Sequence, residues 1–167
     1  MFGRTVATLI SAALVAATLV AAEPAAPAGI GTAIAGGDWN DGGIDWKGYE
    51  EGLALAAKSG KPVCLIFYTD WCPHCTNYSR VFHDDKVVEM AKKFVMVRIN
   101  RDQNRELSAK YAPDGEYIPR TYFLSPKGEL WASVHAPRAQ FQYFYDEHNP
   151  GSLLEGMRTA LGKLGKS

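Results

Sequence analysis

The feature that most constrains the fold is an unbroken apolar segment, residues 63–68, that ends just before a pair of cysteines, Cys72 and Cys75. A run of this length and composition is typical of a β-strand that is buried on both faces. Pro73 directly follows the first cysteine. Proline is favoured at the first position of an α-helix, because the N–H that it lacks would be unpaired there anyway. The segment therefore predicts a buried strand that leads, through a short link, into a helix with Cys72 at its N-terminus.

Two cysteines separated by two residues can exchange a disulfide with another protein. The partial positive charge of a helix N-terminus favours the thiolate, which is the nucleophile in this exchange. Cys75 would lie one turn inside the helix, within reach of a mixed disulfide formed at Cys72. The pair is therefore predicted to be a redox-active centre that needs no separate cofactor.

Two other interpretations of the pair are weaker. A structural zinc site needs a second pair of ligands, but Cys64 falls in the predicted core strand and the histidines outside the motif have no paired spacing. A structural disulfide between Cys72 and Cys75 would close a loop too short to add much stability. We therefore expect no bound metal, and we expect Cys64 to be an inert thiol in the core.

The N-terminal residues have the pattern of an export signal. Arg4 precedes an uncharged apolar run, residues 6–20, which is followed by the small residues Ala21 and Ala22. This pattern predicts a signal peptide over residues 1–22 that is cleaved after Ala22. A retained membrane anchor is the alternative, although the run is short for a bilayer span. After cleavage we expect no membrane span and a periplasmic or extracellular protein, in a compartment where disulfides form and persist.

Charge and composition narrow the class of protein further. The 18 basic and 18 acidic residues balance, so the sequence gives no reason to expect a nucleic-acid partner or an anionic membrane surface. Residues 23–37 are rich in Ala, Pro and Gly and are predicted to form a flexible leader. The remaining residues, 38–167, have the size of one domain, which we expect to act as a monomer.

Within this domain, helical and strand patterns alternate. Two strands joined through helices, followed by a hairpin and a last helix, predict an α/β fold with a central mixed sheet flanked by helices. Five helices are expected: one over residues 46–59 with Asp45 as its cap, one that begins at Cys72, one capped by Asp84 or Asp85, one over residues 105–111, and a last one that begins at a Ser152–Glu155 capping box. The expected strands are 63–68, 94–99, 120–124 and 129–134, and the turn at 125–128 joins the last two in a hairpin.

The motif Trp-Cys-Pro-His-Cys at residues 71–75 and the motif Pro-Asp-Gly-Glu-Tyr-Ile-Pro-Arg at residues 113–120 resemble the thioredoxin superfamily. In particular they resemble the thioredoxin-domain-containing proteins of the endoplasmic reticulum and their anterior-gradient relatives. The similarity extends over residues 39–164. Because the C-terminus carries no endoplasmic-reticulum retention signal, the chain resembles an exported, bacterial member of this group.

The resemblance implies a thioredoxin-like fold and a role for several residues. Cys72 would be the attacking thiolate and Cys75 the resolving thiol. The bond before Pro119 would be cis, and this proline would lie against the active-site pair. The backbone of Ile118, the residue before it, would pair with an extended segment of a client protein.

The residues between and before the cysteines bear on the direction of electron flow. A charged or polarised His74 would stabilise the thiolate and thus the reduced form, which makes the disulfide a stronger oxidant. The alternative is a solvated His74 with little influence. The Pro73-His74 pair also occurs in the disulfide-forming DsbA proteins, although this chain lacks their helical insertion. Ile66 stands where many thioredoxins have a buried acid, so Cys75 would lose its proton to water or to a group that the sequence does not identify.

Three further features are candidates for supporting roles. Trp71 is expected to shield the thiol pair. Arg120 either adds positive potential near Cys72 or lies solvated at the surface. The aromatic segment 140–145 either packs over the core or contacts clients.

Together these features predict a thiol–disulfide oxidoreductase that acts on cysteine-containing exported clients, in the direction of disulfide formation or isomerisation. A redox partner that the sequence does not identify would recycle the pair. The alternatives are a periplasmic reductase, for example of haem-attachment cysteines in cytochrome c maturation, a copper carrier that uses Cys72, Cys75 and His74, and a chaperone that holds clients.

Overall fold

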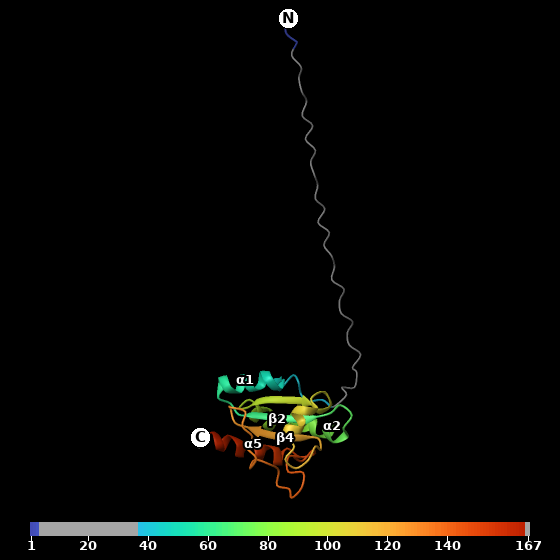
Figure 1. Ribbon diagram of the computed structural model, residues 1–167, viewed down its shortest axis with the longest axis vertical. Helices are drawn as coiled ribbons and strands as arrows, with labels where there is room; N and C mark the ends of the chain where they lie inside the picture. The colour runs from blue at the N-terminus through green and yellow to red at the C-terminus, as the bar shows by residue number, and fades with distance from the viewer. Residues whose placement is uncertain (4–36, 166–167) are drawn as a thin grey trace. The chain divides into compact units, whose positions relative to one another are not determined.

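The computed structural model describes residues 1–3 and 37–165 (Figure 1). Residues 4–22 of the predicted signal peptide and residues 23–36 of the predicted leader lie outside the described residues. Gly37 is buried, with a φ of +91°, and a Cβ at this position would collide with Ser79. The folded domain therefore includes Gly37, which the sequence assigned to the leader.

A four-stranded sheet forms the centre of the domain, in the order β1-β3-β2-β4. β1 and β2 run parallel to β3, and β4 runs antiparallel to β2, so the sheet is mixed as predicted. β2 is the apolar segment described above, and its first five residues are fully buried between two neighbouring strands. The strands are β1 (Trp46–Lys47), β2 (Val63–Tyr68), β3 (Val95–Asn100) and β4 (Arg120–Leu124).

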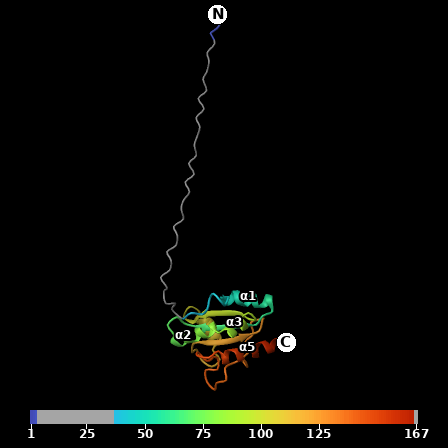
Figure 2. The ribbon, with the colours of Figure 1, turned by 180° about the vertical axis from the view of Figure 1, so that it is seen from behind.

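Helices cover both faces of this sheet. Figure 1 shows α1 on one face and α5 on the other, and Figure 2 shows α2 and α3 from behind. The helices are α1 (Tyr49–Ser59), α2 (Pro73–Ser79), α3 (Asp85–Ala91), α4 (Arg105–Lys110) and α5 (Gly151–Leu164), with short 3₁₀ helices η1 (Arg80–His83) and η2 (Arg101–Gln103).

The sheet separates two apolar clusters. One cluster contains side chains of α2, α3 and α5 and alternate residues of the strands, among them Ile66 and Phe123. The other contains side chains of α1 and the opposite residues of the same strands, among them Phe67 and Tyr122. A Cβ at Gly52 would collide with Val97, so glycine at this position lets α1 pack closely on β3. We call the first cluster the thiol face, because all three cysteines belong to it.

Two predicted helix caps are wrong, for a shared physical reason. Asp45 does not cap α1: it forms an ion pair with Lys47 at 2.8 Å, and the helix starts only at Tyr49 because residues 46 and 47 pair with β3. Ser152 does not cap α5 either, since its hydroxyl accepts the N–H of Asp146 at 3.0 Å and the helix already begins at Gly151. In both cases another partner engages the residue that was expected to cap the helix.

The predicted hairpin forms only at its turn. Ser125 and Glu129 close the turn through an N–H to carbonyl bond of 2.8 Å, but the pairing that follows is a single bridge between Leu124 and Leu130. Beyond the bridge the chain turns away from the sheet, and Val134 becomes buried in the thiol-face cluster. The strand expected over residues 129–134 is therefore absent from the described structure: Leu130 and Trp131 are only partly buried, and Val134 packs into the core from an irregular segment.

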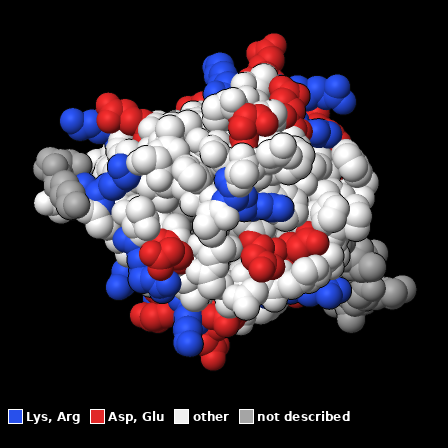
Figure 3. All heavy atoms as spheres, turned by 90° about the horizontal axis from the view of Figure 1, so that it is seen from below, with Lys and Arg blue, Asp and Glu red and all other residues white. Residues whose placement is uncertain are grey.

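The surface of the domain carries both signs of charge. On the face shown in Figure 3, Lys and Arg side chains are interspersed with Asp and Glu side chains. Within residues 1–3 and 37–165, no helix is both long enough and apolar enough to cross a membrane.

Candidate active site

The candidate site lies where β2 ends and α2 begins. The link of residues 69–71 leads to Cys72, which is the N-cap of α2, and Pro73 is the first residue of the helix. The backbone N–H of Cys75 donates a hydrogen bond to the Cys72 sulfur at 3.3 Å. The expected position of Cys72 at a helix N-terminus is therefore confirmed.

A second contact of Cys72 comes from the segment before β4. The peptide bond between Ile118 and Pro119 is cis. The Cys72 thiol is directed at the Ile118 carbonyl oxygen, with a sulfur to oxygen distance of 3.9 Å. The carbonyl before the cis bond thus faces the first cysteine, although 46 positions in the sequence separate Ile118 from Cys72.

Cys75 is fully buried. Burial raises the pKa of the Cys75 thiol well above its ordinary value, and its contact with Cys72 adds to the increase. Ile66, which stands where many thioredoxins have a buried acid, is also fully buried and belongs to the same apolar cluster as Cys75. The second thiol therefore stays protonated near neutral pH. Both active-site cysteines are free thiols in this structure.

Trp71 stands beside the thiols with 65% of its surface exposed. Its indole N–H donates to Asp102 Oδ2 at 2.7 Å, and the Arg101 guanidinium lies 5.7 Å from its ring centroid. The hydrogen bond from Trp71, followed by contacts with Arg101, lowers the pKa of the Asp102 carboxyl. η2 thus holds the indole at the rim of the site. No local pattern in the sequence indicated Asp102, because the residue lies 31 positions from Trp71, in the short helix η2.

His74 has a partner that the sequence did not indicate. Its Nδ1 lies 3.0 and 2.9 Å from the two carboxylate oxygens of Glu147. The ring of Phe144 packs edge-on against the imidazole, with centroids 5.8 Å apart. Neither Glu147 nor Phe144 belongs to a helix or strand, so no periodic pattern could have placed them here.

Arg120 is not at the surface, and the expectations for it need correction. The residue is fully buried, and its guanidinium donates to the carbonyl oxygens of Tyr111 and Gly115 at 3.0 Å each and to Ser108. It lies over the rings of Phe67 and Tyr122, which belong to the cluster opposite the thiol face. Alternation along β4 turns Arg120 away from α2.

Only part of the aromatic segment 140–145 packs over the core, and its contact with clients stays a prediction. Tyr143 and Tyr145 are buried in the core, on opposite sides of the sheet. Phe144 lies at the active site against His74, and Phe141 is half exposed. Packing over the core therefore describes the two tyrosines alone.

The remaining thiol and the other potential ligands lie apart from this chemistry. Cys64 is fully buried as predicted, and burial raises its pKa far above the ordinary value. Among the residues that the structure describes, no group of three or more His, Cys, Asp or Glu side chains is arranged to hold a metal ion.

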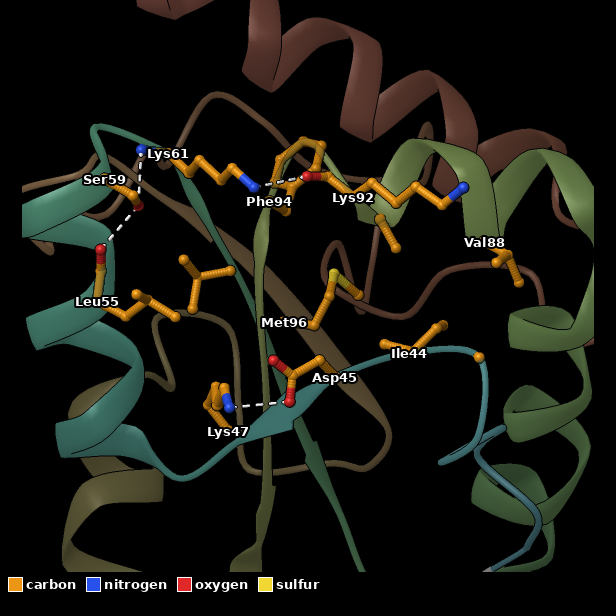
Figure 4. Close-up of a pocket in the computed structure, with 13 residues that line it drawn as sticks. Ile44, Asp45, Lys47, Leu55, Ser59, Lys61, Val88, Lys92, Phe94 and Met96 are labelled. Atoms are coloured by element: carbon orange, nitrogen blue, oxygen red, sulfur yellow. Dashed lines mark hydrogen bonds and ion pairs between the residues drawn. The ribbon is translucent and has the colours of Figure 1, made fainter.

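A separate cavity of about 320 Å³ lies beside β1, between α1 and α3 (Figure 4). Leu55 and Val88 line it from the two helices, and Met96 lines it from β3. Near its rim, Lys47 is paired with Asp45. The described residues that line this cavity include no cysteine and no histidine, so it contributes no thiol chemistry.

A mixed sheet between helices, with a Cys-x-x-Cys pair at the start of α2 next to a cis-proline, defines the thioredoxin class of fold. A family model described as "Thioredoxin-like" matches residues 45–126, and the chain belongs to the thioredoxin-like family. Within this family it is similar to the anterior gradient protein 2 homolog of Homo sapiens, with 31% identity over 128 residues that cover 75% of this chain and 71% of the relative. Anterior gradient protein 3 of Homo sapiens is 32% identical over 126 residues, which cover 74% of each chain.

Solved structures agree on the fold. A thioredoxin from Thermus thermophilus superimposes with a TM-score of 0.56 at 24% identity, covering 74% of this chain and 91% of the other. A structure titled DsbH oxidoreductase gives a TM-score of 0.54 at 22% identity, covering 85% of this chain and 95% of the other. At these identities the likeness supports the fold alone.

Proposed function

We propose that this protein is a thiol–disulfide oxidoreductase that acts on cysteine-containing client proteins through Cys72 and Cys75, in the direction of disulfide formation or isomerisation. The observation that carries the proposal is the setting of the Cys72 sulfur. It accepts the Cys75 N–H at 3.3 Å and lies 3.9 Å from the Ile118 carbonyl, next to the cis bond. The N–H supports the thiolate form, and backbone beside the sulfur offers an edge along which an extended client can pair.

The reaction is a two-electron exchange. In the oxidised protein a client thiolate attacks the Cys72 sulfur, the bond to Cys75 breaks, and Cys75 leaves with the electron pair and takes up a proton. A second client thiolate then attacks the client sulfur of the mixed disulfide and releases Cys72 as a thiolate. The client loses two electrons as its disulfide forms, the active-site pair gains them, and a separate redox partner reoxidises the pair.

The setting of the second cysteine supports this direction. Only a thiolate attacks a disulfide, and burial raises the pKa of Cys75 so that it remains a thiol near neutral pH. Its return attack on the mixed disulfide is therefore slow. The mixed disulfide then persists long enough for a second client thiol to react, which favours oxidation or isomerisation over reduction.

We also propose that the exchange takes place outside the cytosol, in the periplasm or the extracellular medium. The predicted signal peptide over residues 1–22 supports this location. An oxidising compartment supplies the conditions under which client disulfides persist.

The test is to trap the intermediate. The Cys75→Ala variant, expressed with its full N-terminus in a bacterial host, is expected to accumulate mixed disulfides with client proteins at Cys72. These would appear on non-reducing gels of the periplasmic fraction and disappear on reduction. The Cys72→Ala variant should trap nothing, and Cys64→Ala, the matched control with a buried thiol removed, should trap as little as the unmodified protein. If Cys75→Ala gives no more mixed disulfide than Cys72→Ala, the proposed function is wrong.

A further inference from the structure

The carboxylate of Glu147 contacts the active-site residue His74. Glu147 lies in the connection between β4 and α5, 73 positions after His74, yet both of its oxygens are within 3.0 Å of the His74 Nδ1. The Glu147 side chain is only 12% exposed, whereas that of His74 is 59% exposed. The carboxylate is therefore the fixed member of this pair, and the imidazole is the member with room to move.

The neighbouring chain holds Glu147 in place. The Asp146 N–H donates to Ser152 Oγ in the first turn of α5, and the Asp146 carboxylate accepts the N–H groups of His148 and Asn149. The His148 imidazole Nε2 lies 3.3 Å from Glu147 Oε1, an oxygen that His74 also contacts. These bonds tie the segment around Glu147 to α5, so the carboxylate is presented to His74 by an ordered part of the fold.

A second contact of His74 comes from Phe144, whose ring is covered by the Arg138 guanidinium. The Arg138 guanidinium lies 4.9 Å from the Phe144 ring centroid and donates to the Phe144 carbonyl at 2.9 Å. The Phe144 ring packs edge-on against His74. Between them, Phe144 and Glu147 fix the orientation of an imidazole that is otherwise exposed.

This arrangement bears on the strength of the disulfide as an oxidant. A positive charge near the first cysteine stabilises its thiolate and hence the reduced pair, which makes the disulfide more oxidising. A carboxylate within 3.0 Å of the His74 ring opposes that effect, because it adds a negative charge and anchors the imidazole. We propose that Glu147 is a positioning residue, which anchors His74 and offsets its charge and so makes the active-site disulfide a weaker oxidant than an unanchored histidine would. This inference rests on the proposed function, since it concerns the potential of the same cysteine pair.

Glu147→Gln removes the charge of Glu147 and leaves the neighbouring charged and titratable groups in place. Arg138, Asp146 and His148 surround Glu147, and each stays unchanged in the Glu147→Gln variant. Glutamine keeps an oxygen that can accept a hydrogen bond from His74, but it removes the negative charge. Any change in the redox equilibrium then reports on the charge and on the freedom of His74.

The experiment uses the mature protein, without the predicted signal peptide. It measures the equilibrium between the reduced and the oxidised Cys72–Cys75 pair in glutathione buffers. Relative to wild type, Glu147→Gln is expected to shift the equilibrium about fivefold toward the reduced pair, which is about the size of one charge interaction screened by water. That fold-change corresponds to about 20 mV for a two-electron couple. The control Glu155→Gln, which removes an exposed carboxylate of α5 that pairs with Arg158, is expected to shift it less than twofold.

A second pair of variants tests whether Glu147 acts through His74. In the His74→Ala background, Glu147→Gln should shift the equilibrium less than twofold. Equal shifts with and without His74 would overturn the positioning role, as would an unchanged equilibrium in Glu147→Gln alone. Both results are distinguishable from failure of the proposed function, in which the pair would not equilibrate with glutathione as a two-electron couple in any variant.

Discussion

The two faces of the sheet hold their polar groups in very different surroundings. On the face opposite the thiols, Arg120 is fully buried. Its guanidinium donates hydrogen bonds to the carbonyl oxygens of Tyr111 and Gly115 and to the Ser108 hydroxyl of α4. On the thiol face, the Cys72 sulfur makes two longer contacts, and the side chains beside it, Trp71 and His74, are more than half exposed.

This difference separates stability from chemistry. A buried guanidinium held by several acceptors favours one conformation, because losing those acceptors leaves a desolvated group unpaired. A sulfur with weak partners at the edge of a cluster can exchange them for a substrate at little cost. The segment that contains Ile118, Pro119 and Arg120 therefore serves both faces. The Ile118 carbonyl faces Cys72, while Arg120 forms hydrogen bonds on the opposite side of the sheet.

The largest effect that would test this separation is expected at Arg120. Arg120→Met removes a fully buried charged donor from the Tyr111 and Gly115 carbonyl oxygens and from Ser108, so the free energy of unfolding should fall by about 3 kcal/mol. Urea denaturation followed by circular dichroism measures this loss. Arg120→Lys, which keeps the charge and part of the hydrogen bonding, should lose less and provides a folded variant for redox measurements. A changed redox equilibrium in Arg120→Lys would show that the two faces are not separate.

A smaller effect is expected from the pH dependence of stability on the thiol face. Burial raises the pKa of Cys64 in the folded state, so the unfolded chain releases this proton first as the pH rises. The unfolded state then binds fewer protons, and stability declines above about pH 8.5, the ordinary cysteine value. By pH 9.5 the loss amounts to about 1.4 kcal/mol for one such thiol.

The matched comparison uses Cys64→Val, which keeps an apolar side chain of similar size in β2. The difference in unfolding free energy between wild type and this variant, both reduced, should change by about that amount between pH 7.5 and 9.5. A pH-independent difference would contradict the assignment of Cys64 as a protonated core thiol.

Local sequence patterns predicted the elements that build the thiol face. The apolar run became β2, the Cys-Pro step became the start of α2, and Asp84 caps α3 by accepting the N–H groups of residues 86 and 87. These features depend on neighbouring residues, so a single sequence suffices to identify them. The resemblance to thioredoxins added Pro119, whose proximity to the cysteines no local pattern encodes.

What the sequence did not reveal depends on contacts between distant segments. Arg120 was expected near the thiols because it follows Pro119, but strand alternation directs it to the other face. Glu147 reaches the motif from an irregular segment and Asp102 from the short helix η2, 73 and 31 positions from their partners. The caps expected at Asp45 and Ser152 failed because other partners engage both residues.

The most direct test of the proposed activity is the reduction potential of the Cys72–Cys75 pair in the wild-type protein. The protein is equilibrated in glutathione buffers of defined ratio, and the reduced and oxidised forms are separated after thiol alkylation. We predict a two-electron couple more oxidising than about −200 mV, in the range of enzymes that form or rearrange disulfides. A potential below about −200 mV, toward the thioredoxin value of about −270 mV, would contradict the oxidising direction.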